Sequence, residues 1–129
     1  MEAKIPKDLL YTEDHEWARK ENGEVIEGIT DFAQSELQDI VYIELPEVGQ
    51  EVAQGDSIAT IEAVKTVTDL YAAVSGSVVK VNKELEKKPE LINKDPYDSG
   101  WIVKIKISDP AELDTLLMPA EYKKVIQEE

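Results

Sequence analysis

Hydrophobic and polar residues alternate along most of the first hundred positions, which is the pattern of strands with one buried face. The segment WIVKIKI (101–107) is the clearest case, and the turn sequence ENGE (21–24) joins two short apolar runs around Trp17 and Val25. The same reasoning predicts further strands at 40–45, 51–53, 57–63, 66–72 and 77–82. The chain is therefore expected to be mainly β.

Two segments instead have the apolar spacing of a helix. The first covers about 31–37, where Thr30 can cap the helix N-terminus. The second covers about 109–127, and Pro119 divides it, which predicts two short C-terminal helices. Between residues 83 and 100 the chain reads as irregular, with a turn or two of helix.

Length and composition narrow the class of protein. The chain has 129 residues, which suits one domain (1–129) with a β core at about 11–107. It contains no cysteine and one histidine, His15, so we expect no disulfide, no thiolate or His-rich metal site and no Cys nucleophile. Acidic residues outnumber basic residues 28 to 14, and the formal charge of −14 argues against nucleic-acid binding, which needs a basic surface.

No sequence feature points to a membrane or to export. No apolar run approaches the length that crosses a bilayer, and the N-terminal segment lacks the apolar stretch of a signal peptide. We therefore expect a bacterial cytoplasmic protein as the first choice, with a mature mitochondrial protein as the second.

The segment IEAVKTVTDL (61–70) places Lys65 between two predicted strands, at a bend without Gly, Pro or Asn. A bend at Val64–Lys65 points the amine away from both strands, where it is either an ordinary solvated lysine or a site of acylation. A Schiff-base role is disfavoured, because it requires a desolvated pocket that lowers the pKa of the amine.

Several blocks give the chain a family resemblance. YTEDHEW (11–17), GITDFAQSEL (28–37), VYIELPEVG (41–49), EAVKTVTDLYAAVSG (62–76) and PELINKDPYDSGW (89–101) resemble the H proteins of the glycine cleavage system, in the order typical of that family. The resemblance implies a lipoyl/biotinyl-type fold, either a flattened β-barrel or a sandwich of two small antiparallel sheets. It also implies that lipoate is covalently attached at Lys65.

The resemblance further implies a carrier and not an enzyme. A lipoyl arm carries the aminomethyl group of glycine from the glycine decarboxylase (P protein) to the aminomethyltransferase (T protein), and dihydrolipoyl dehydrogenase (L protein) reoxidises it. Attachment requires a lipoate ligase, or an octanoyltransferase with lipoyl synthase. A shuttle that visits several enzymes is most simply a monomer.

The resemblance also implies acidic side chains around the lipoyl arm when it carries the aminomethyl group. The amine of that group is positively charged, so acids would attract it, and four acids are candidates. The resembled family uses a glutamate and an acid shortly after the lysine, which are Glu16 and Asp69 here; Asp14 and Glu36 occupy neighbouring aligned positions. Without the resemblance, each of them reads as a solvated surface acid.

The chain departs from the family pattern at four positions. Ala63 replaces a serine, Thr66 an alanine, Gln38 the glycine of L-G-D, and Ala73 a frequent proline. These departures keep an alternative open: an H-like lipoate-binding protein of a heterodisulfide-reductase-like sulfur-oxidation system, or a lipoyl relay carrier. A biotin carrier fits less well, because that family favours methionines beside its lysine.

Overall fold

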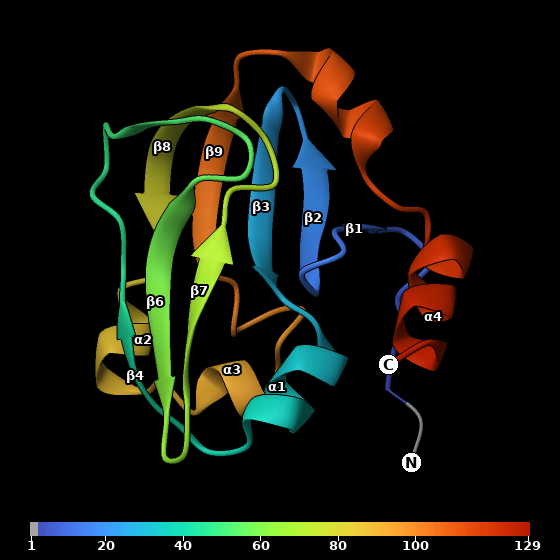
Figure 1. The fold of residues 1–129 in the computed structure, drawn as a ribbon. Helices are drawn as coiled ribbons and strands as arrows, with labels where there is room; N and C mark the ends of the chain where they lie inside the picture. Colours follow the sequence, from blue (N-terminus) through green and yellow to red (C-terminus); the bar gives the residue numbers. More distant parts are fainter. Residues whose placement is uncertain (1–2) are drawn as a thin grey trace.

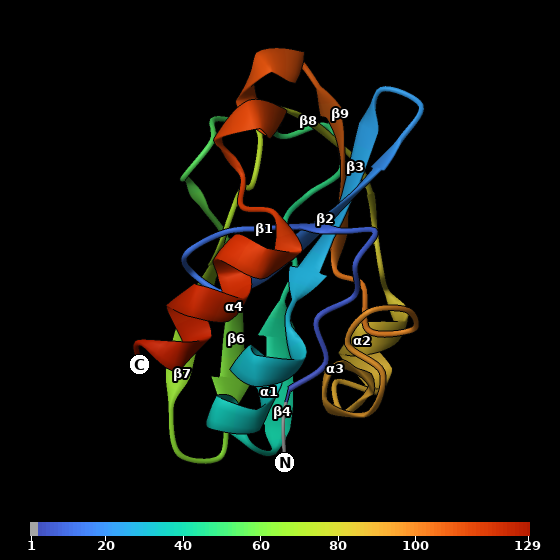
Figure 2. The same ribbon diagram turned by 90° about the vertical axis from the view of Figure 1, so that its right-hand side faces the viewer.

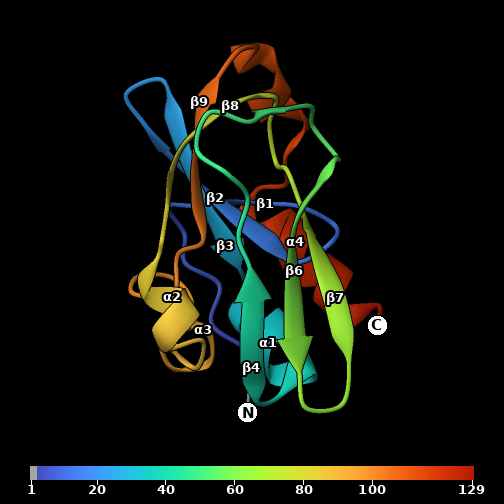
Figure 3. The same cartoon turned by 90° about the vertical axis from the view of Figure 1, so that its left-hand side faces the viewer.

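The structure, a computed structural model, describes residues 3–129 and contains two antiparallel sheets (Figure 1). The strands are β1 Leu10–Tyr11, β2 Glu16–Glu21, β3 Glu24–Ile29, β4 Ile40–Glu44, β5 Glu51–Val52, β6 Ser57–Ala63, β7 Val67–Tyr71, β8 Gly76–Val81 and β9 Val103–Ile107. One sheet has the order β1-β2-β3-β9-β8-β5 and the other the order β4-β6-β7. Figure 3 shows β4, β6 and β7 side by side in front of β2 and β3.

The two sheets do not close into a barrel, so the barrel form of the expectation is wrong and the sandwich form is confirmed. β7 is one edge strand of the smaller sheet, and none of the described strands of the larger sheet pairs with it. In place of a neighbouring strand, side chains of the larger sheet meet the end of β7. The Tyr71 N–H donates to Glu16 Oε2 at 2.6 Å, and the Ala73 N–H donates to Glu27 Oε1 at 2.9 Å.

The main core lies between the sheets and is built from the alternating apolar positions. Val25 of β3 and Val78 of β8 are both register partners of Ile105 on β9, and all three are almost fully buried. Ile61 and Leu70 fill the same layer from the smaller sheet. Burial of one such side chain contributes about 1.5–3 kcal/mol, so this layer accounts for much of the stability.

Within residues 3–129, five short helices connect or follow the strands: α1 Asp31–Leu37, α2 Glu84–Lys87, α3 Leu91–Lys94, the 3-10 helix η1 Pro110–Thr115 and α4 Pro119–Gln127.

A second, smaller core packs the C-terminal helix α4 against the larger sheet. Tyr122 of α4 stacks on Tyr11 with ring centroids 4.6 Å apart, and Trp17 lies fully buried in the same cluster. Figure 2 shows α4 in front of β1.

Local sequence signals explain most element boundaries. The predicted helix at 31–37 is confirmed, and its cap is Thr30, whose side chain accepts from the Ala33 N–H at 3.2 Å. The β2–β3 turn has Asn22 and Gly23 at positive φ, as a two-residue hairpin turn of this type requires. The two short helices predicted at 109–127 are confirmed as η1 and α4, and Pro119 is the first residue of α4. None of the helices between residues 3 and 129 is long and apolar enough to span a membrane.

Candidate functional site

Lys65 lies on the turn that joins β6 to β7, at one end of the molecule (Figure 1). The Ala63 N–H donates to the Thr66 carbonyl at 2.8 Å and closes the turn, and the Val64 N–H donates to the Asp39 carbonyl at 3.0 Å. Neither Val64 nor Lys65 has a positive φ, which explains why the bend needs no glycine. The backbone of the turn is therefore held on both sides.

The Lys65 side chain is exposed, and Val64 beside it is 67% exposed. Within residues 3–129, Lys65 makes no hydrogen bond and no ion pair. An amine without partners on a fixed turn can be reached by an acylating enzyme, and acylation breaks no interaction of the folded chain. These properties fit a covalent attachment point for a carboxylic-acid cofactor.

Gln38 supports the turn and has an unusual backbone. It ends α1 with φ 63° and ψ −142°, a region that side chains other than glycine rarely adopt. Its carbonyl accepts from Asn93 Nδ2 at 2.6 Å, and the next residue, Asp39, accepts from Val64. The departure from a family glycine at this position therefore puts strain at the base of the Lys65 turn.

Glu16 lies in the wall of a cavity of about 260 Å³ and is only 2% exposed. Its Oε1 accepts from Thr12 Oγ1 at 2.8 Å, and its Oε2 accepts from the Tyr71 N–H. Burial raises the pKa of Glu16 to about 7, although the two hydrogen bonds oppose that effect; the nearby Asp14 carboxylate adds to it. The carboxyl group therefore changes charge close to neutral pH.

The structure brings two of the four predicted acids together and separates the other two. Asp14 lines the same cavity as Glu16 and is itself exposed. Asp69 is exposed on β7 opposite Thr60 and does not line the cavity. It lies two residues before Tyr71, which does line it, so both are on one face of the strand.

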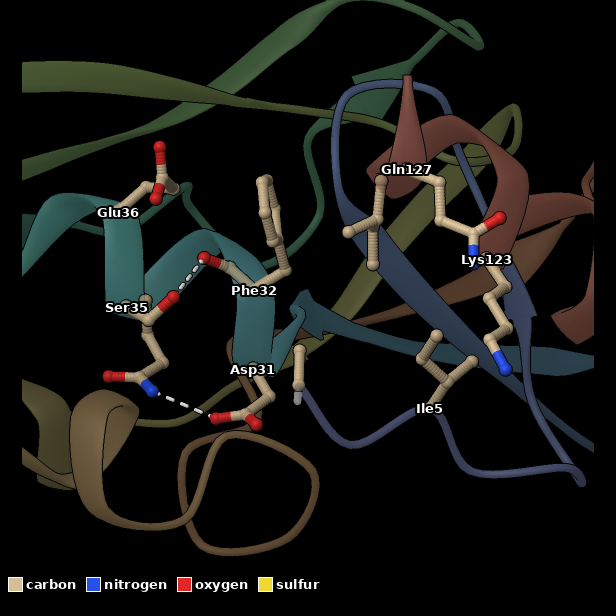
Figure 4. Close-up of a pocket in the computed structure, with 10 residues that line it drawn as sticks. Ile5, Asp31, Phe32, Ser35, Glu36, Lys123 and Gln127 are labelled. Atoms are coloured by element: carbon tan, nitrogen blue, oxygen red, sulfur yellow. Dashed lines mark hydrogen bonds between the residues drawn. The ribbon is translucent and has the colours of Figure 1, made fainter. Parts of the chain in front are cut away.

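Glu36 lies elsewhere, in α1. It lines a cavity of about 430 Å³ between α1, α4 and the N-terminal segment. Figure 4 shows Phe32 of α1 and Lys123 of α4 on opposite sides of this space. Glu36 is exposed and shares no lining residue with the Glu16 cavity.

Glu27 is the residue that the sequence reasoning missed. It is fully buried and accepts from the N–H of Ala73, which lines the Glu16 cavity. The signal was present, because Glu27 falls between Val25 and Ile29 on the apolar face of an alternating strand. The departure at Ala73 also gains a reason: proline has no N–H to donate, whereas alanine does.

The described residues form no metal-holding cluster, and His15 bonds to the C-terminal part of the chain. Between residues 3 and 129, no group of three or more His, Asp or Glu side chains is placed to hold a metal ion. His15 bonds to the Tyr122 hydroxyl through Nδ1 at 2.9 Å and meets Glu129 through Nε2 at 2.6 Å. The histidine therefore ties the residue just before β2 to α4 and to the C-terminal residue.

Comparisons with known proteins agree with this architecture. The family model of the glycine cleavage H-protein matches residues 9–129. A glycine cleavage system H protein of Listeria monocytogenes is 57% identical over 122 residues, covering 95% of this chain and 98% of that protein. A protein of the same name from Carboxydothermus hydrogenoformans is 54% identical over 125 residues, covering 97% of this chain and 96% of that protein.

A solved structure gives the same result. The crystal structure of a glycine cleavage system H protein from Mycobacterium marinum superposes with a TM-score of 0.87 at 39% identity, covering 95% of this chain and 99% of that one. All of these relatives are named as glycine cleavage H proteins, which favours that assignment over the sulfur-oxidation alternative. The chain therefore belongs to the glycine cleavage H-protein family.

Proposed function

We propose that this chain is the lipoyl carrier of a glycine cleavage system, with (R)-lipoate joined to the Nζ of Lys65 by an amide bond. The observation that carries the proposal is the position of Lys65: an exposed amine on a turn whose backbone is held by Thr66 and Asp39. Family membership supports the same assignment. The chain acts as a carrier and as a substrate of its partner enzymes, not as an enzyme itself.

The partners follow from the glycine cleavage system. They are the glycine decarboxylase (P protein), the aminomethyltransferase (T protein) and dihydrolipoyl dehydrogenase (L protein), together with the enzymes that attach lipoate or build it from octanoate. When bound, lipoate supplies a disulfide that accepts the aminomethyl group and is later regenerated. We place the protein in the bacterial cytoplasm as a monomer and a single domain.

We further propose that the loaded arm rests along β7. Val67, Asp69 and Tyr71 lie on one face of that strand and lead from the Lys65 turn to the Glu16 cavity. Val67 to Tyr71 spans about 13 Å, which the lysine stem and the carbon chain of lipoate can cover together. Asp69 on this face and Glu16 in the cavity wall would hold the positive amine of the loaded arm.

Attachment is tested by intact-protein mass spectrometry of material made in a host that lipoylates proteins. Wild-type protein should gain the mass of one lipoyl group, and Lys65→Arg should gain none. Lys20→Arg, a change at an exposed lysine beside the β2–β3 turn, is the matched control and should be modified like wild type. Lipoylation of Lys65→Arg at another lysine would contradict the proposal.

The resting position is tested by the lifetime of the aminomethyl adduct on lipoylated protein. Glu16→Gln removes the buried charge and Asp69→Asn the exposed one, so both should shorten the lifetime, with the larger effect at Glu16. Glu47→Gln changes an exposed acid outside the cavity and serves as the control. Equal lifetimes in all four proteins would rule out a role for the acids.

A further inference from the structure

The carboxyl group of Glu27 is buried without full hydrogen bonding. The side chain is 0% exposed and lies between Val25 and Ile29 on the core face of β3. Its Oε1 accepts one hydrogen bond, from the Ala73 N–H, and its Oε2 has no hydrogen-bond partner among residues 3–129. An ionised carboxylate in such a place is very costly unless a cation pairs with it.

Glu27 and Glu16 form one arrangement. Ala18 of β2 is the register partner of Glu27, so Glu16 is its diagonal neighbour on the same face of the sheet. The two carboxyl groups accept hydrogen bonds from the amides of Tyr71 and Ala73, and both of these residues line the cavity. The pair thus holds the stretch of chain that forms one cavity wall.

No positive charge offsets this pair in the part of the chain that the structure describes. None of the ion pairs there involves either glutamate, and the β9 residue opposite Glu27 is Val103. The other titratable groups that line the cavity are all acidic: Tyr11, Glu13, Asp14 and Tyr71. Burial, followed by the charge of Glu16, raises the pKa of Glu27 well above its usual range. Glu16 has two donors and faces the cavity, so it takes the first charge.

We propose that Glu27 is a positioning residue of this cavity: it stays a neutral carboxylic acid, holds Ala73 in the wall, and leaves Glu16 as the single buried charge. The ligand that such a site matches is one primary alkylammonium group. The inference rests on the proposed role of Glu16 and deepens it. It also accounts for Ala73, where the resembled family frequently has proline, because only a residue with an N–H can be held by Glu27.

The first test measures the charge of Glu27 in the unmodified 129-residue chain, from the carbon-13 shift of its carboxyl carbon. The signals are assigned by comparison with Glu16→Gln and Glu27→Gln. We expect Glu27 to keep the shift of a carboxylic acid near neutral pH, where Glu16 titrates. A carboxylate shift for Glu27 at about pH 7 overturns the proposal.

The second test separates positioning from simple stability. Glu27→Leu removes the acceptor, so the Ala73 amide should exchange its hydrogen about tenfold faster, and the aminomethyl adduct on lipoylated protein should be lost several-fold faster. Glu27→Gln restores a neutral acceptor and should reverse both effects. Val25→Ala weakens the same face of β3 but keeps Glu27 as the acceptor for the Ala73 N–H, so it should change neither measurement.

The outcomes distinguish the two proposals. If Glu16→Gln leaves the adduct lifetime unchanged, the proposed role of Glu16 in binding the aminomethyl group fails. The carbon-13 shifts still decide whether Glu27 is neutral, and the exchange rates still decide whether it holds the Ala73 amide. If Glu16→Gln shortens the lifetime and Glu27→Leu leaves both the lifetime and the exchange at wild-type values, the inference about Glu27 fails alone.

Discussion

Replacing Glu16 by Gln is expected to change how stability depends on pH. Burial raises the pKa of Glu16 in the folded protein from 4.5 to about 7. The folded state therefore holds this proton more tightly than the unfolded state, and folding becomes less favourable as pH rises from 4.5 to about 7. At lower pH the residue is neutral in both states and carries no penalty, whereas at higher pH the penalty is complete.

The size of this change in stability follows from the difference between the two pKa values of Glu16, 4.5 and about 7. At about 1.4 kcal/mol per pH unit, the penalty reaches about 3 kcal/mol above neutral pH. Glutamine does not titrate, so the free energy of unfolding of the variant should gain about 3 kcal/mol relative to wild type over that range. Glutamine has one acceptor oxygen for the two donors Thr12 and Tyr71, which costs about 1–3 kcal/mol at every pH. The loss of the titrating group changes how the free energy of unfolding varies with pH, whereas the loss of an acceptor lowers it by the same amount at every pH. Measurements over a range of pH therefore separate the two effects.

The assay is urea unfolding followed by tryptophan fluorescence, repeated between about pH 4.5 and about pH 8, with linear extrapolation to water. Trp17 is a suitable probe because it is fully buried and donates from Nε1 to the Pro96 carbonyl at 2.9 Å. Glu47→Gln, at an exposed loop position, should run parallel to wild type. Parallel curves for Glu16→Gln and wild type would refute the argument that burial governs this carboxyl group.

Three further changes test the fold around the site by the same unfolding assay. Gln38→Gly should stabilise the protein by about 1 kcal/mol, because it relieves a backbone strain of about 1–3 kcal/mol and adds a smaller entropy cost; lower stability would show that the conformation is not strained. Thr30→Ala should cost about 2–3 kcal/mol, because it removes both the α1 cap and the 2.7 Å hydrogen bond to Tyr122, and Thr30→Ser should recover most of it. Gly76→Ala should cost at least about 4 kcal/mol, because its Cβ falls 1.8 Å from a carbonyl oxygen of β9. Gly23→Ala, which meets nothing within 4 Å, should cost only about 1–2 kcal/mol, and equal costs would contradict the packing at Gly76.

The sequence alone was sufficient for the local features. Alternation located the strands, because an alternating strand has to bury one face, and Thr30 marked the start of α1. The Asn22–Gly23 turn was readable because few residues tolerate positive φ. The family followed from blocks of sequence, and the exposure of Lys65 was predictable because a residue at the tip of a bend between two strands points away from both.

The tertiary structure decided which acids are buried and which are exposed. Glu16 and Asp69 are both acids in strand sequences, yet one is buried and the other exposed. The difference arises because the end of β7 meets β2, a strand some fifty residues earlier in the chain, and desolvates Glu16 there. The burial of Glu27 was readable from the alternation of β3, but its hydrogen bond to Ala73 was not. A local pattern reports which face of a strand is buried, whereas the partners and the charge of a buried acid depend on how the two sheets meet.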